Sequence, residues 1–186
     1  MKRKIRLCLS VLLLLATESM ADVKSLVGLE VGFGQVNIKS DEIQQAEDIT
    51  ETVPLAGIKI GAQSDSYRVF LDAHYYFTGD FEYISAYGVS LQYLFNFSKK
   101  ANFFLGLNTG FLDAEYKDKN SVTRTFSDTY IGADAGLNYH LNDMIDFEFG
   151  ARFMDVNEEN IKNGVTYTLD PIINGYASVI IKYDLD

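Results

Sequence analysis

The residues best suited to acid–base or nucleophilic chemistry in this 186-residue chain are its two histidines. His74 follows Asp72 by two residues and precedes Tyr76 by two. His140 lies within the short segment 138–142. A histidine that activates a nucleophile needs a serine or a comparable group within hydrogen-bonding reach. Neither histidine has an adjacent serine in a matching pattern, so we expect no catalytic residue and a structural or interfacial role for both.

Charged residues at alternate positions in otherwise apolar segments form a second candidate group. Those predicted to share one face and to form ion pairs are Glu30, Lys59, Arg68, Asp72, Asp134, Glu148 and Arg152, accompanied by His74, Asp128, Asp146 and Lys182. A buried charge is costly unless a partner of opposite sign and hydrogen bonds satisfy it. Counting from the turns places Glu30, Lys59 and Asp72 at similar depth on successive strands. Asp134 is expected near Glu148 and Arg152 on the next strand.

No sequence pattern for a cofactor or metal site occurs. The Gly-x-Gly pairs lie inside predicted strands and not before a helix, which removes their usual phosphate-binding meaning. No zinc-ligand spacing and no calcium-binding loop is present. We therefore expect neither a cofactor nor a bound metal.

The elements that must position these residues are predicted to be eight strands, at about 26–36, 53–63, 66–77, 82–97, 101–115, 126–141, 144–155 and 167–185. Polar and apolar residues alternate along them, and 11 of the 14 glycines fall on the polar face. Phe104 and Leu112 are exceptions on that face. Alternation through eight segments predicts a barrel with a polar interior and an apolar outer surface.

The strand lengths and the loops favour a membrane. Most strands reach the roughly 9 to 11 residues that a tilted strand needs to cross a bilayer, whereas globular strands are nearer 5 or 6. Tight turns alternate with long polar loops at 37–52, 116–125 and 156–166. The residues expected to face lipid include Val89, Leu91, Leu105, Leu107 and Phe149.

Residues 1–21 have the features of a secretory signal peptide, and residues 22–186 are expected to form the mature domain. Four basic residues precede an apolar run at 7–16, and a small-x-small cleavage site ends at Ala21. The run is shorter than the roughly 20 residues of a membrane-spanning helix. Cleavage leaves 12 basic against 25 acidic residues, which disfavours a nucleic-acid partner.

Two soluble folds compete with the membrane interpretation. A β-sandwich explains neither the strand lengths nor the asymmetry of the loops. A lipocalin is an eight-stranded barrel as well, but its apolar face would point inward and its glycine-rich face would meet water. Glycines weaken a water-facing strand, whereas they relieve crowding in a narrow bore, so the glycines favour the membrane.

The signal peptide, the eight long strands, the three long loops and the glycine-rich polar interior resemble the small OmpA/OmpX-like family of outer-membrane barrels over the mature chain. The resemblance implies an all-β, eight-stranded antiparallel up-and-down transmembrane β-barrel. It also implies contact with outer-membrane lipid and lipopolysaccharide, and insertion by the barrel-assembly machinery. Such barrels commonly end on an aromatic residue, whereas this chain ends Tyr183-Asp184-Leu185-Asp186, and the recognition of that end stays open.

Three functions are open for such a barrel. A lumen plugged by ion pairs predicts a structural or surface-interaction role, which we favour because side chains about fill an eight-stranded bore. An unfilled path would make a narrow channel for small solutes. Some small barrels are lipid A-modifying enzymes, but the surroundings of the histidines argue against catalysis. An extracellular ligand would bind through loops 37–52, 116–125 and 156–166, whose sequences do not identify it.

Overall fold

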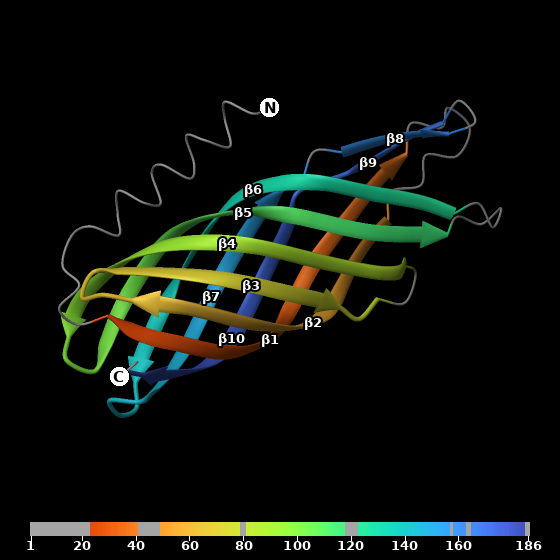
Figure 1. Cartoon of the computed structure of the whole chain (residues 1–186). Coiled ribbons are helices and arrows are strands. Elements are labelled where there is room, and N and C mark those ends of the chain that lie inside the picture. Colours follow the sequence, from red (N-terminus) through yellow and green to blue (C-terminus); the bar gives the residue numbers. More distant parts are fainter. Residues whose placement is uncertain are drawn as a thin grey trace, which may run out of the picture.

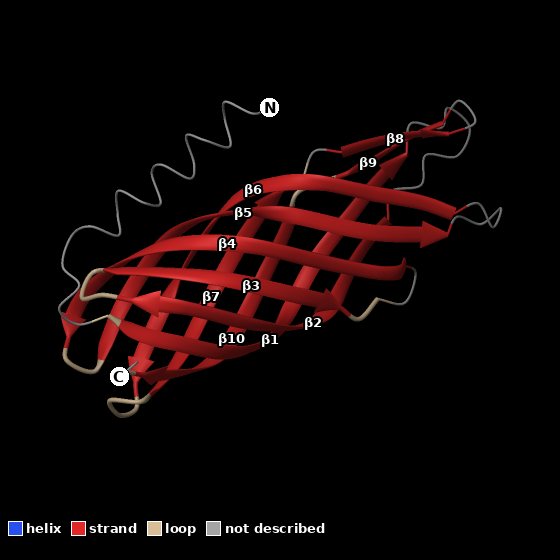
Figure 2. Ribbon diagram, viewed as in Figure 1, coloured by secondary structure: helices blue, strands red, loops and turns tan. Residues whose placement is uncertain are grey.

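The computed structural model describes residues 23–40, 49–78, 81–117, 123–156, 158–162 and 165–184. Within these ranges the chain consists of ten β-strands and their connections (Figure 2). A helix that could span a membrane is absent from the same ranges. The predicted signal peptide, residues 1–21, lies outside the described residues.

Eight strands close into an antiparallel barrel (Figure 1). They are β1 (Lys24–Ser40), β2 (Ile49–Gln63), β3 (Tyr67–Tyr76), β4 (Phe81–Ser98), β5 (Ala101–Lys117), β6 (Thr123–His140), β7 (Ile145–Asp155) and β10 (Ile172–Tyr183). Successive strands pair from β1 to β7, β10 pairs with β7, and β1 pairs with β10. Because the last strand joins the first, the sheet has no open edge along that ladder. The predicted eight-stranded antiparallel barrel is confirmed.

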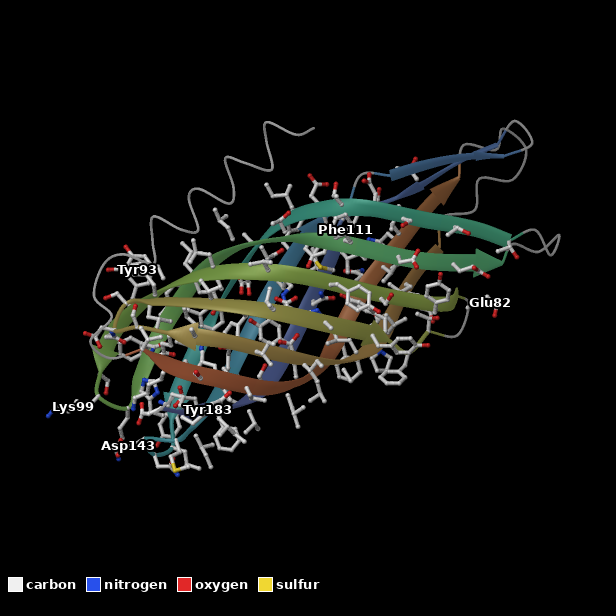
Figure 3. All side chains as sticks on the ribbon, in the orientation of Figure 1. Glu82, Tyr93, Lys99, Phe111, Asp143 and Tyr183 are labelled. Atoms are coloured by element: carbon white, nitrogen blue, oxygen red, sulfur yellow. The ribbon has the colours of Figure 1, made fainter. Side chains whose placement is uncertain are left out.

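The barrel has one end with short turns and one end where longer strands project. Residues 64–66, 99–100 and 141–144 connect strands at the first end, which we call the turn end. Figure 3 places Lys99 and Asp143 there and Glu82 at the opposite end, the loop end. β1 begins and β10 ends at the turn end, where Ser25 pairs with Tyr183.

Side chains alternate between the bore and the outer surface along the barrel strands. In β10, Ile180 is 1% exposed, whereas its neighbours Val179 and Ile181 are 40% and 47% exposed. Successive side chains of a strand point to opposite faces, so alternate residues line the bore and the residues between them face outward. The buried charged residues belong to the set that lines the bore. Gly28 faces the bore, where an added Cβ would stand 2.7 Å from Cγ of Lys59. Glycine at this position makes room for the long side chain opposite.

Aromatic side chains gather in two groups on the outer surface. Toward the turn end, the Tyr93 ring packs edge-to-face on Tyr67 and Phe95, with centroids 5.1 and 4.7 Å apart. Toward the loop end, Tyr75 packs on Phe77 with centroids 5.3 Å apart. The exposed aliphatic side chains between the two groups include Leu29, Val31, Ile58, Ile60, Leu105, Leu107 and Leu137. This arrangement is that of a protein whose rings lie at two interfaces and whose middle contacts hydrocarbon.

A further hairpin, β8 (Glu158–Lys162) and β9 (Val165–Leu169), lies beyond the loop end (Figure 1). The predictions of a loop at 156–166 and of one strand at 167–185 are therefore wrong. β9 pairs with the end of β1 from Ile38↔Leu169 to Ser40↔Tyr167, which gives its backbone partners. The interruption between β9 and β10 includes Pro171, which has no N–H to donate to a ladder.

The other two predicted loops, 37–52 and 116–125, are shorter than expected because the strands beside them continue. β1 and β2 stay paired to Ile38↔Ile49, and β5 and β6 stay paired to Lys117↔Thr123. Cross-strand hydrogen bonds satisfy the backbone whatever the side chains are, so polar composition alone does not end a strand. Residues 41–48 and 118–122 of these loops lie outside the described residues.

Candidate functional site in the barrel lumen

Buried charges occupy the bore from its middle to the turn end. Among the described residues the buried carboxylates are Glu30, Asp72, Asp134, Asp146 and Glu148, and the buried cations are Lys59, Arg68, Arg152 and Lys182. Five anions and four cations nearly balance, so most of these charges lie within reach of one of opposite sign. Such balance matters because a buried ion without a partner is strongly destabilising.

Lys59 on β2 binds two glutamates. Its Nζ lies 2.8 Å from Oε2 of Glu30 on β1 and 2.9 Å from Oε1 of Glu148 on β7. The ammonium also lies 4.9 Å from the centroid of the Tyr176 ring, within the range of a cation–π contact. Glu148 is a partner that the sequence did not indicate for Lys59, since β1 and β10 lie between β2 and β7 in the sheet.

Arg68 on β3 reaches across the bore. Its Nη2 donates to Oε2 of Glu148, and its Nε donates to Oε1 of Gln92 at 2.7 Å. Three strands separate β3 from β7 in either direction around the barrel, so this ion pair spans the diameter. The guanidinium carbon lies 4.9 and 5.0 Å from the ring centroids of Phe70 and Phe104. Arg68 therefore fills the bore with both its charge and its stacking surface.

Arg152 on β7 binds Glu30 from a second direction. Nη1 and Nη2 donate to the two carboxylate oxygens of Glu30 at 2.9 and 3.3 Å. Nη1 also lies 2.8 Å from Nε2 of His74. Nε2 lies 3.1 Å from Oε1 of Glu30 as well, and Nδ1 faces Oδ1 of Asp72 at 3.5 Å. His74 is thus held between an arginine and an aspartate.

The two remaining central carboxylates accept from neutral side chains. Ser90 donates to Oδ2 of Asp72 at 3.3 Å, and Gln92 donates to Oδ2 of Asp134. The backbones of Asp134 and Arg152 are cross-strand partners, as the depth count requires, while the guanidinium turns to a glutamate. No group of three or more histidine or carboxylate side chains in the described part of the chain could hold a metal ion.

A smaller polar cluster surrounds Asp146 near the turn end. Its carboxylate is 2.7 Å from Nζ of Lys182 and 2.8 Å from Nδ1 of His140, and it accepts from Asn138 at 3.0 Å. The other imidazole nitrogen of His140 lies 3.2 Å from the amide nitrogen of Asn102. Both nitrogens of the ring therefore face groups that hold it in place.

The residues predicted to face lipid lie on the outer side of their strands. Leu105, Leu107 and Phe149 are 51%, 69% and 59% exposed. Val89 and Leu91 are half-buried among neighbouring side chains of the same face. Val89 pairs across the strands with Leu71 and Thr109, and cross-strand partners share a face, so Val89 belongs to the outer surface. Leu91 follows it by two residues on β4 and therefore has the same face.

The loop end of the bore is apolar, which the alternation of polar and apolar residues did not indicate. A cluster of buried side chains, here the apolar layer, consists of Val36, Val53, Leu55, Tyr76, Ile84, Ala86, Leu112, Ala114, Tyr130, Met154, Val156, Leu169 and Ile172. Asn174 donates to the Tyr76 hydroxyl at 2.9 Å and connects this layer to the polar part. Asp128, a charge predicted to lie in the bore, is exposed. The sequence signal that could have indicated this layer is the presence of apolar residues such as Leu112 among the inward-facing residues near the loop end.

The comparison with protein families identifies the chain. A model described as the outer membrane protein β-barrel domain matches residues 7–169. The chain belongs to this family. A search of curated proteins found no match.

Solved structures of outer-membrane barrels share this fold. Neisserial surface protein A matches with a TM-score of 0.60 and 15% identity, covering 83% of this chain and 97% of its own. OprG from Pseudomonas aeruginosa matches with 0.58 and 15% identity, over 87% and 97%. OprH from P. aeruginosa matches with 0.55 and 18% identity, over 86% and 99%. The outer-membrane barrel described here is therefore located in the outer membrane, and its exposed apolar belt contacts lipid.

Proposed function

We propose that this outer-membrane barrel is a non-conducting structural protein that presents its loop end to the cell exterior. The observation that carries the proposal is the Lys59 ammonium bound to both Glu30 and Glu148 in the middle of the bore. A side chain on β2 that is bound by β1 and by β7, two strands further round the barrel, leaves no continuous water path there. The predicted ion pairs thus act as a plug.

Two stacked layers support closure. The ion-pair network crosses the bore through Arg68 and Glu148, and the apolar layer fills the bore above it toward the loop end. The two layers exclude ions for different reasons. The first fills the bore with fixed charges that are paired with one another, and the second offers a passing ion no polar group to replace its lost hydration. An eight-stranded bore is just wide enough for its own side chains to fill it.

A non-enzymatic role fits the surroundings of the histidines. The contacts of His74 are with Arg152, Glu30 and Asp72, and all of these atoms are deeply buried. His140 contacts a carboxylate and an amide. General-base catalysis needs an imidazole nitrogen directed at a nucleophile, and these contacts use the ring nitrogens to bind neighbours. We infer that the protein is not a lipid A-modifying enzyme and uses no cofactor.

A surface-interaction role rests on the strands that continue past the aromatic group at the loop end. β1 with β2, β5 with β6, and the β8–β9 hairpin extend there. We propose that residues 37–52, 116–125 and 156–166, which include these strand ends and the hairpin, contact an extracellular ligand or lipopolysaccharide headgroups. Insertion by the barrel-assembly machinery is expected for a barrel of this family.

Conductance across a planar bilayer tests closure. The refolded protein should give no stable openings, and regular single-channel steps would establish the narrow channel instead. Removing one layer should leave the bore closed, so neither Lys59→Met/Glu148→Gln nor Tyr76→Ala/Leu112→Ala should conduct alone. The variant combining all four changes should conduct, since both barriers are then weakened. Conduction by either double variant would mean that a single layer closes the bore.

A further inference from the structure

Asp134 is a buried carboxylate in the middle of the bore whose charge is not offset by a basic side chain. Gln92 donates to its Oδ2, whereas Oδ1 has no hydrogen-bond partner. Arg152, its cross-strand neighbour, binds Glu30 instead, and no other lysine or arginine of the described residues forms an ion pair with Asp134. Because an uncompensated buried charge is costly, a further positive charge is expected beside Asp134.

Asn108 on β5 is a second buried polar side chain whose hydrogen-bonding groups are unused. It is 3% exposed, and within the described residues neither its amide oxygen nor its amide nitrogen has a partner. Buried amides are hydrogen-bonded in the large majority of cases, so an amide with both atoms unused indicates a bound ion or water beside it. Asn108 therefore indicates independently that a group is bound at this part of the wall.

Two glycines open the wall between these two side chains. Gly106 pairs with Asp134, and Asn108 pairs with Gly132, so the polar residues occupy one diagonal and the glycines the other. An added Cβ on Gly132 would stand 2.7 Å from Oδ1 of Asn108, and Oδ1 of Asp134 is the atom nearest to an added Cβ on Gly106. Diagonal neighbours lie about 7 to 8 Å apart, and hard cations bind oxygen ligands at about 2.3 to 2.6 Å. One ion can therefore bind both unused oxygens.

We propose that Asp134 and Asn108 bind one monovalent cation, Na⁺, through these two oxygens, with water completing its coordination. Carboxylate and amide oxygens are the ligand types that hard cations prefer. With His74 neutral, the five buried carboxylates and four buried cations leave one negative charge in excess. A monovalent cation balances it, whereas a divalent cation would leave an excess positive charge in the bore.

Water alone and an anion are poorer occupants of this site. Water would satisfy the amide of Asn108 but leave the charge of Asp134 without compensation. An anion could meet the unused Nη1 of Arg68 or Nε of Arg152, but both guanidiniums already bind glutamates, and a further anion would double the excess negative charge. The sequence has no metal-ligand spacing for this site because its two ligands come from separate strands.

Stability with and without Na⁺ tests the proposal. The protein is refolded into phosphatidylcholine vesicles in NaCl or in choline chloride of equal ionic strength, because choline is too large for the site. Above the dissociation constant, each tenfold rise in Na⁺ should lower the unfolding equilibrium constant of wild type about tenfold. Asp134→Asn and Asn108→Leu should lose this dependence. In choline chloride Asp134→Asn should be more stable than wild type, since the amide keeps an oxygen for Gln92 and removes the buried charge. Asp128→Asn is the matched control, the same change at an exposed position of β6, and should keep the full dependence.

Four results would overturn the proposal. Equal stability of wild type in the two salts would mean that the site holds water only. Stability that falls as the pH rises and ignores Na⁺ would mean that Asp134 holds a proton. Ca²⁺ stabilising at a lower concentration than Na⁺ would contradict a monovalent ion, and Na⁺ dependence kept by Asn108→Leu and Asp134→Asn would place the ion elsewhere. Heat-dependent gel mobility reports folding, and either variant alone suffices should the other not fold. Lumen closure is a separate matter, because both variants leave the apolar layer intact and should not conduct.

Discussion

Lys59 shares one ammonium between Glu30 and Glu148, and all three side chains are buried. The change Lys59→Met keeps the length of the side chain and removes the charge between two carboxylates. We expect the free energy of unfolding to fall by about 3 to 5 kcal/mol, and by less where water enters the bore. Urea unfolding in lipid vesicles measures the loss.

The double variant Lys59→Met/Glu148→Gln should recover part of that stability, because one of the uncompensated carboxylates is removed. Lys99→Met in the exposed turn between β4 and β5 is the control and should unfold like wild type. Residues in one network give coupled effects, whereas independent residues give additive ones. Additive losses across the Lys59 and Glu148 cycle would show that the ion pair contributes nothing to stability.

Leu107 is 69% exposed on the outer face of β5, in the aliphatic band between the two aromatic groups. An arginine at the bilayer midplane costs roughly 2 to 4 kcal/mol, and near an interface it costs roughly 0 to 1. Leu107→Arg should therefore destabilise the folded barrel far more than Thr52→Arg, which lies outward near the loop end. Unfolding from vesicles of both variants gives the comparison, and equal losses would contradict the assigned depth of Leu107.

At the scale of elements, β7 and β10 contain two glycines on opposite faces of the same wall. An added Cβ on Gly150 would stand 2.6 Å from Cζ of Tyr176, whereas Gly175 faces open space. The Tyr176 ring cannot retreat easily, because Lys59 and Arg152 lie over it. Gly150→Ala should cost about 1 to 3 kcal/mol through overpacking.

The change Gly175→Ala is the matched control on the outer face. It should be neutral or stabilise by about 0.5 to 1 kcal/mol, because alanine loses less conformational entropy than glycine in a strand. Thermal or urea unfolding of both variants gives the sign. A neutral Gly150→Ala would show that the bore has spare room beside Tyr176, which would weaken the argument for a filled lumen.

At the scale of the whole molecule, the two ends of the barrel should meet different compartments. Lys117 and Lys162 lie at the loop-side ends of β5 and β8, whereas Lys99 and Lys100 lie in a turn at the other end. With the loop end outside, trypsin added to intact cells should cut near Lys117, Lys119 or Lys162 and spare the turn. The membrane-embedded strands should stay whole, because paired strands in lipid offer no unfolded backbone to a protease.

Mass spectrometry of the surface-treated protein identifies the cut sites. Cleavage at Lys99 or Lys100 in intact cells would reverse the proposed orientation. Permeabilised cells provide the control, in which the turn between β4 and β5 becomes accessible as well. Release of the protein with the soluble periplasmic fraction would contradict insertion in the membrane.

The pattern of residues along the sequence was sufficient to predict the barrel architecture. The period-two alternation, the strand lengths and the placement of glycines indicated an eight-stranded barrel with an apolar exterior, and the family match and the fold agree. Alternation is readable because each strand has only two faces, and one of them must meet lipid along its whole length. The same reasoning placed Lys59 and Glu30 on the inner face of adjacent strands.

The identity of partners across the bore required the closed barrel. Lys59 with Glu148 and Arg68 with Glu148 join strands far apart in the chain, and a period-two pattern contains no information about which inward residues meet across the diameter. The apolar layer and the β8–β9 hairpin were missed for related reasons. Leu112 looks like an isolated exception on its own strand because most of its companions in the apolar layer are on other strands. The hairpin gains its backbone partners from the end of β1, more than a hundred residues earlier in the chain. Such contacts depend on closure of the sheet, which sets the distances between strands that the linear sequence leaves free.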